Sequence, residues 1–223
     1  EVRFKHADIH DTVPTFPEAL TRLHVGGAFP VPYFFTLPRT LLDLTIDGSI
    51  LPHGHVEVTI ALTPDQTALL ASTNNFIFTG LPVGLRRLCV GTKVPLNNEH
   101  GGLLPPQLEH LDVETEAKLS NMTLFPHSLR VLRISCKAWN LTPMFQLGTL
   151  PPALVEFSMN QTSKFSDTHL GAIPPSVTNL SLQGCGFTLT DAVFDHLPPK
   201  IARLVLSTNL ITMRAIAENL PPT

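Results

Sequence analysis

The residues best suited to chemistry in this chain are ten histidines and three cysteines, Cys89, Cys136 and Cys185. Two histidine pairs have metal-ligand spacing: His6 and His10 could share one face of a helix, and His53 and His55 one side of a strand. Neither pair has a third ligand nearby in the sequence, so we interpret both as exposed surface histidines. No glycine-rich phosphate loop, G-x-S-x-G, H-E-x-x-H or C-x-x-C motif occurs. The motifs therefore assign no catalytic residue, no cofactor and no metal, and we expect a chain that is not an enzyme.

Composition narrows the classes of protein. With 223 residues the chain could form one or two domains or one elongated repeat array, and 43% hydrophobic residues exclude a disordered chain. Fifteen Lys and Arg against 18 Asp and Glu give a net charge of −3, so we expect no nucleic-acid partner. No apolar stretch of about 18 residues is present, which predicts no membrane span.

Three features of the sequence bear on the expected location. An odd, dispersed set of cysteines and the absence of a visible leader favour an intracellular, cytoplasmic protein. Four N-x-S/T sequons leave secretion open, because glycans could be attached at Asn121, Asn140, Asn160 and Asn179.

Proline recurs with a fixed relation to leucine. Eight apolar anchors are Leu23, Leu44, Leu88, Leu111, Leu132, Phe157, Leu180 and Leu204. Each has a proline six residues earlier, namely Pro17, Pro38, Pro82, Pro105, Pro126, Pro151, Pro174 and Pro198. The anchor spacings are 21, 44, 23, 21, 25, 23 and 24, and we interpret the 44 as two periods of 22. A repeat of this length indicates stacked coils that share one core, since a single short strand cannot bury its apolar side alone.

The repeated L-P-x-x-L-x-x-L-x-L string resembles the leucine-rich-repeat family over nearly the whole chain. It is most similar to the short repeats of bacterial secreted effectors and of some protist proteins. The resemblance implies an α/β solenoid, a curved array with a parallel β-sheet on the concave face and short helices or turns on the convex face. Asn209 matches the family's buried asparagine and Cys185 is an accepted variant one unit earlier. In the other units the asparagine position is occupied by Ser49, Lys93, Glu116, Lys137 and Thr162. These replacements predict coils that are less regular than is usual for the family.

The repeat frame predicts the organisation of the chain. Residues 1–15 would be an N-terminal cap or the end of an earlier repeat, and residues 16–223 a single array of about eight or nine coils. An irregular unit at 50–80 is expected to hold a strand at Val56–Leu62 and a helix at Pro64–Ala71. The segments after Thr190 and Thr212 are expected to be short helices on the convex side. Leu220-Pro221-Pro222 opens a further unit, so we expect the array to be truncated at its C-terminus.

In this frame three rows of side chains point outward on the concave face. The first row is Arg22, Asp43, Arg87, His110, Val131, Glu156, Asn179 and Arg203. The second is His24, Thr45, Cys89, Asp112, Arg133, Ser158, Ser181 and Val205. The third is Gly26, Asp47, Gly91, Glu114, Ser135, Asn160, Gln183 and Ser207.

An acidic patch on this face (Asp112, Glu114, Glu116) adjoins a basic one (Arg130, Arg133), which is typical of a partner-binding strip and equally of an ordinary solvated sheet face. We predict that partner contacts come from Arg87, His110, Asp112, Glu114, Arg133, Glu156 and Arg203.

Cys89 would point outward beside His110 and Asp112 of the next coil. A cysteine–histidine pair can act as a nucleophile, but without an oxyanion donor or a pocket an unreactive thiol is favoured.

Three functions fit these observations. The first is a protein–protein interaction scaffold that binds a protein partner through the concave sheet or the array ends, as a component of a larger assembly. The resemblance implies a second, the recognition arm of a multidomain enzyme such as a ubiquitin ligase, whose catalytic domain would lie outside this chain. A third is a structural subunit of a large complex, contacting its neighbours through convex-side aromatics such as Trp139, Phe145 and Phe165.

Overall fold

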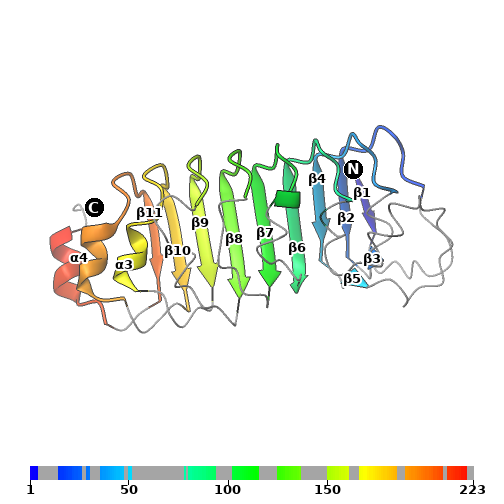
Figure 1. Ribbon diagram of the computed structural model, residues 1–223. Helices are drawn as coiled ribbons and strands as arrows, with labels where there is room; N and C mark the ends of the chain where they lie inside the picture. The colour runs from blue at the N-terminus through cyan, green and yellow to red at the C-terminus, as the bar shows by residue number, and fades with distance from the viewer. Residues whose placement is uncertain are drawn as a thin grey trace.

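The computed structural model describes residues 1–4, 15–26, 29–30, 36–47, 50–51, 78, 80–93, 102–115, 125–136, 150–160, 166–184, 189–207 and 210–219. Within them nine parallel strands form one sheet, the main sheet, in the order β1-β2-β4-β6-β7-β8-β9-β10-β11 (Figure 1). These strands are β1 (Val2–Phe4), β2 (Arg22–Val25), β4 (Asp43–Ile46), β6 (Arg87–Lys93), β7 (His110–Thr115), β8 (Val131–Cys136), β9 (Glu156–Asn160), β10 (Asn179–Gln183) and β11 (Arg203–Leu206). Strand order follows sequence order, which is the topology of a solenoid, and the predicted fold class is confirmed.

The register of the main sheet matches the repeat frame. Leu44 pairs with Leu23 on one side and with Leu88 on the other, and the same relation continues through the anchors to Leu204. Because side chains alternate across a strand, the anchor and the residue two positions later both face inward. In the main sheet the inward face of the strands is therefore apolar, and the outward face is mostly polar.

The recurring proline acts in a turn that precedes each strand. In all eight units its carbonyl oxygen accepts a hydrogen bond from the amide three residues later, as in Leu108 to Pro105 at 3.0 Å. The ring fixes φ and has no N–H, so proline suits a position just before the ladder begins. The turn also directs a third apolar residue inward, and Leu41, Leu85 and Leu108 are fully buried there.

One continuous core runs along the inner side of the main sheet. Its members include Leu44, Leu111, Phe157 and Leu180, which are at most 1% exposed. Burying each such side chain contributes roughly 1.5–3 kcal/mol, so the stack of coils is held mainly by these residues. At the edge of the described sheet, Leu204 of β11 is only half-buried.

Short helices follow the last strands, as predicted. The helices described after β9, β10 and β11 are α3 (Asp167–Leu170), the 3-10 helix η3 (Asp191–His196) and α4 (Met213–Asn219). Thr190 and Thr212 are the expected capping residues, since their side-chain oxygens accept hydrogen bonds from the amides of Ala192 (3.3 Å) and Ala215 (3.2 Å).

A ladder of Asp–Thr contacts joins these helices from coil to coil. Asp167 accepts hydrogen bonds from the amide and hydroxyl of Thr190, at 3.0 and 2.6 Å. Asp191 does the same for Thr212, at 2.6 and 2.9 Å. The first turn of each helix thus fixes the capping threonine of the next.

The 44-residue spacing does not represent two coils of the main sheet. Leu44 and Leu88 are direct partners in the ladder between β4 and β6, which corrects the interpretation as two periods. Instead a second, two-stranded parallel sheet pairs β3 (Phe29–Pro30) with β5 (Ile50–Leu51). The strand expected at Val56–Leu62 and the helix expected at Pro64–Ala71 lie outside the described residues.

Several other expectations also fall on residues outside the described ranges. These include the histidines at 6, 10, 53 and 55, Asn121 and Asn140 of the sequons, and the aromatic residues Trp139, Phe145 and Phe165. They also include Glu116 of the acidic patch, the repeat positions Ser49, Lys137, Thr162, Cys185 and Asn209, and the unit opening at 220–222. Residues 2–4, placed in a cap or an earlier repeat by the sequence, form the edge strand β1. The part of the chain that the structure describes has no helix long and apolar enough to cross a bilayer.

Candidate functional site

The side of the main sheet that carries the outward residues is the candidate site, and we call it the open face. The helices lie on the other side, because Leu170 of α3 and Val193 of η3 belong to the same core as the inward residues of the strands. Open-face side chains are mostly half-exposed and alternate with buried ones, as in β9. None of the described helices therefore covers the polar residues of the strands.

The first outward row is continuous across the sheet. Arg22, Asp43, Arg87, His110, Val131, Glu156, Asn179 and Arg203 are successive register partners from β2 to β11. The second row is aligned in the same way. The third row departs from prediction at β6, where an irregularity between Val90 and Lys93 pairs Lys93, not Gly91, with Glu114. A bulge of this kind inserts residues into one strand of a pair and locally disturbs the ladder.

An arginine links two acids at the centre of the open face. Arg133 of β8 donates from Nε to Oε1 of Glu156 at 2.6 Å, and its Nη1 lies 3.6 Å from Oδ2 of Asp112. The hydrogen bond to Glu156 raises the pKa of Arg133, so its positive charge is retained at all ordinary pH values. Charges of both signs are thus held in fixed places on three adjacent strands.

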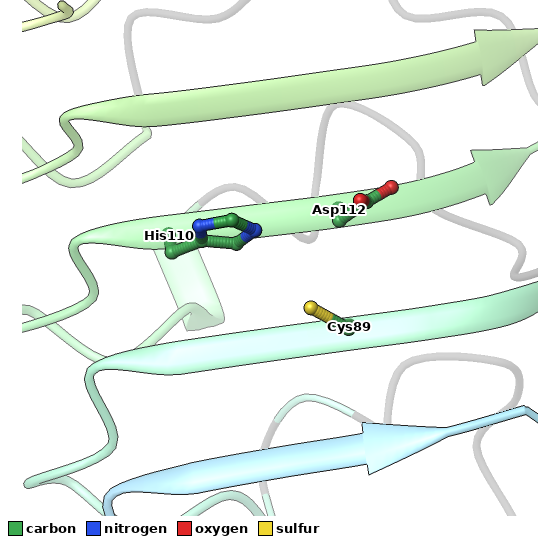
Figure 2. Close-up of side chains that lie close together, drawn as sticks. All are labelled: Cys89, His110 and Asp112. Carbon is green, nitrogen blue, oxygen red and sulfur yellow. The ribbon is translucent and has the colours of Figure 1, made fainter. Parts of the chain in front are cut away.

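Beside this arginine lies a compact group made of Cys89, His110 and Asp112. Each offers one ligand-type atom, Sγ, a ring nitrogen or a carboxylate oxygen, and these atoms all lie within 4.8 Å of one another. Figure 2 shows His110 and Asp112 on one strand, β7, and Cys89 on its neighbour, β6. Cys89 is the register partner of Asp112, and His110 precedes Asp112 by two residues, so all three share the open face.

Burial sets the protonation states within this group. Burial raises the pKa of the Cys89 thiol, and the hydrogen bond from Nε of Arg87 at 3.4 Å offsets this only in part. Burial also lowers the pKa of His110, as do the charges of Arg87 and Arg133. At neutral pH the group therefore consists of a thiol and a neutral imidazole. This supports the prediction of an unreactive thiol, since the nucleophile is the thiolate.

The two ends of the open face differ from its centre. Near the N-terminal end, Nε2 of His24 lies 2.6 Å from Oδ2 of Asp47, and both side chains are well exposed. Toward the C-terminal end, a hollow of about 220 Å³ is lined mostly by polar residues, among them Arg133, Glu156 and Arg203. The smaller hollow beside Arg22 and Asp43 measures about 170 Å³.

The structure therefore brings together five of the seven predicted partner contacts. Arg87 and His110 are neighbours in the first row, and Asp112, Arg133 and Glu156 are joined by the ion pairs. Glu114 lies two residues further along β7, and Arg203 borders the hollow on the edge strand. Sequence reasoning placed these residues on one face but could not give the distances among their side-chain atoms.

Two features of the open face had no signal in the motifs. Oδ1 of Asn160 and Nε2 of His110 are buried atoms without a hydrogen-bond partner among the described residues. Such atoms are costly and rare, so each marks a place where a ligand or water would be favourable. Asn160 and Asn179, which belong to predicted sequons, are half-buried on β9 and β10.

A single sheet of parallel strands in sequence order defines a parallel-strand solenoid, and the L-P-x-x-L-x-x-L-x-L coils that form it are consistent with the leucine-rich-repeat resemblance of the sequence. Among solved structures, the chain is similar to the leucine-rich repeat-containing protein LegL7 from Legionella pneumophila. It has a TM-score of 0.44 and 12% sequence identity, and the match covers 91% of this chain and 71% of that one. No family model and no curated protein matches the sequence. The proposed subtype, with short bacterial or protist repeats, stays a prediction.

Proposed function

We propose that this chain is a non-catalytic scaffold that holds a protein partner on its open face, as a component of a larger assembly. The observation that carries the proposal is the continuous first outward row, which extends over eight register-matched strands. Beside it, Arg133, Asp112 and Glu156 hold charges of both signs at the centre of the open face. Leucine-rich-repeat solenoids commonly use such an extended face for protein–protein interaction, which supports the proposal at the level of fold.

The dimensions of the open face favour a protein over a metabolite. Parallel strands lie about 4.8 Å apart, so nine strands span on the order of 40 Å. The two described hollows of about 220 and 170 Å³ are smaller than the roughly 300–1,000 Å³ typical of small-molecule pockets. A long shallow surface of this kind suits contact with a folded protein or an extended segment of one.

Charge would determine which partner binds. Arg133 lies between Asp112 and Glu156, so a partner must present both an acid and a base in matching positions. Complementary charges of this sort contribute mainly to specificity and association rate. We expect binding to weaken as salt is raised, because half-exposed charges are screened.

The test is affinity purification of the native protein with three baits: the unchanged chain, Arg133→Glu and Lys200→Glu. Arg133→Glu places a third acid between Asp112 and Glu156, so we expect recovery of the partner to fall by about tenfold or more. Lys200 is exposed in the turn before β11 and serves as the control for an equal change of charge.

Mass spectrometry of the eluates distinguishes the outcomes. Stoichiometric partners recovered with the unchanged chain and Lys200→Glu, but depleted with Arg133→Glu, support the open face as the binding site. Equal recovery by all three baits, or recovery of no partner by any, contradicts the proposal.

A further inference from the structure

The group of Cys89, His110 and Asp112 has the composition of a metal site. A thiolate, an imidazole and a carboxylate are all established zinc ligands. The sulfur excludes the hard cations Mg²⁺ and Ca²⁺, which take oxygen ligands, and favours zinc among the abundant divalent ions. No other group of three such side chains this close was found among the described residues.

The backbone supplies the placement that a metal site needs. Cys89 and Asp112 are register partners on β6 and β7, so hydrogen bonds of the ladder fix the distance between their Cα atoms. His110 enters from the same strand as Asp112, two residues earlier and on the same face. Sites built on strands hold their ligands more precisely than sites on loops.

The distances need only a small adjustment to reach zinc geometry. With bonds of about 2.0–2.3 Å and tetrahedral angles, ligand atoms lie about 3.3–3.6 Å from one another. The three atoms here are already within 4.8 Å, so shifts of about 1 Å are sufficient. Rotation about the side-chain torsions of half-exposed residues provides such shifts without moving the strands.

An unsatisfied atom of one of these three side chains also favours a ligand. Nε2 of His110 is buried and has no hydrogen-bond partner among the described residues. An imidazole nitrogen in this condition incurs a desolvation cost that a metal bond would remove. This observation is independent of the clustering of the three side chains.

Two arginines contact the ligand atoms, and both have other partners. Nε of Arg87 bonds Sγ of Cys89 at 3.4 Å, and Arg87 also lies 3.9 Å from Asp43. Arg133 approaches Asp112 at 3.6 Å but bonds Glu156 more closely, at 2.6 Å. Each guanidinium can therefore leave the metal ligand and keep an acidic partner.

We propose that Cys89, His110 and Asp112 bind one Zn²⁺ ion on the open face, with water in the fourth position. Three protein ligands and one open position are the usual pattern of a zinc site that remains accessible to solvent. The proposal does not depend on the partner-binding function, since it concerns the free chain.

The test is titration of the full chain with zinc chloride, followed by calorimetry, for the unchanged protein and for Cys89→Ser, His110→Asn and Asp112→Asn. We expect the unchanged protein to bind one equivalent that each variant loses or binds at least about tenfold more weakly. Even changes to the outer partners of a metal ligand cost tenfold or more, so removal of a ligand should cost no less. Excess Mg²⁺ should not compete.

Two matched controls separate this site from the other histidines and cysteines. His24→Asn removes an imidazole that pairs with Asp47 elsewhere on the open face, and Cys185→Ser removes a different thiol. Both control variants should still bind one equivalent of zinc. With Co²⁺ in place of zinc, the sulfur-to-metal charge-transfer band should appear in the unchanged protein and in Cys185→Ser but be absent from Cys89→Ser.

Thermal unfolding without metal shows whether each variant is folded before its binding is compared. Absence of saturable zinc binding at micromolar concentrations by the unchanged protein overturns the proposal. So does binding that the three ligand variants retain, or a cobalt band that persists in Cys89→Ser. Partner recovery is measured separately, so a failed zinc site leaves the proposed scaffold function standing.

Discussion

The two faces of the main sheet differ in burial and in the residue types they carry. On the inner side of β7, Leu111 and Val113 are at most 1% exposed and pack in one core with their register partners. On the open face of the same strand, His110, Asp112 and Glu114 are half-buried and differ from their neighbours in charge and size. Burial restricts an inward position to a few apolar residues, whereas an outward position can change freely. The inner side therefore specifies the fold, and the open face is available for recognition.

The largest expected effect comes from the inner side. Leu111→Ala should lower the free energy of unfolding by about 2–5 kcal/mol, because it removes a fully buried side chain and leaves a cavity. Asp112→Asn, the adjacent change on the open face, should stay within about 0.5 kcal/mol. Urea denaturation followed by circular dichroism measures both, and similar losses from the two variants would remove the distinction between the faces.

A smaller effect is expected where an aspartate of one helix accepts hydrogen bonds from the capping threonine of the next. Asp191→Ala removes both hydrogen bonds from Thr212 and should cost about 1–2 kcal/mol, because each hydrogen bond usually contributes about 1 kcal/mol net. Asp195→Ala, on the exposed side of the same 3-10 helix, is the matched control. The melting temperatures of the two variants give the comparison. If Asp195→Ala lowers the melting temperature as much, the Asp–Thr ladder does not stabilise the coils.

The smallest effect should come from the ion pair on the open face. A double-mutant cycle with Arg133→Ala and Glu156→Ala should give a coupling energy of about 0.2–1 kcal/mol, since both side chains are partly exposed. The coupling should decrease at high salt. A coupling of several kcal/mol would mean that the open face contributes to folding as the inner side does.

The repeat made most of the fold predictable from sequence. Each anchor, such as Leu111, must be buried against the anchors of neighbouring coils, so its spacing fixes strand, register and face together. The 44-residue interval was misinterpreted because a constant period cannot show that β4 pairs directly with β6. The bulge before Lys93 depends on local backbone geometry, for which the repeat frame gives no signal.

For the candidate site, the sequence predicted which outward row each residue belongs to, but not how close the side-chain atoms lie. Alternation placed Cys89, His110 and Asp112 on one face, but it could not give the separation of their ligand atoms or the unpaired state of Nε2 of His110. These depend on side-chain torsions and on the approach of Arg87 and Arg133. For this reason the sequence assigned no metal, whereas the three-dimensional arrangement leads us to propose one.

Site-specific photocrosslinking tests most directly whether the open face is the recognition surface. A photoactivatable group is attached to a cysteine at Ser158, which is half-buried at the centre of β9, or at Met213, which is 78% exposed in α4. Cys89, Cys136 and Cys185 are first replaced by serine in both proteins, so that each probe has one site. We predict that the partner crosslinks from position 158 and not from position 213. Crosslinking from position 213 alone, or equally from both, would contradict it.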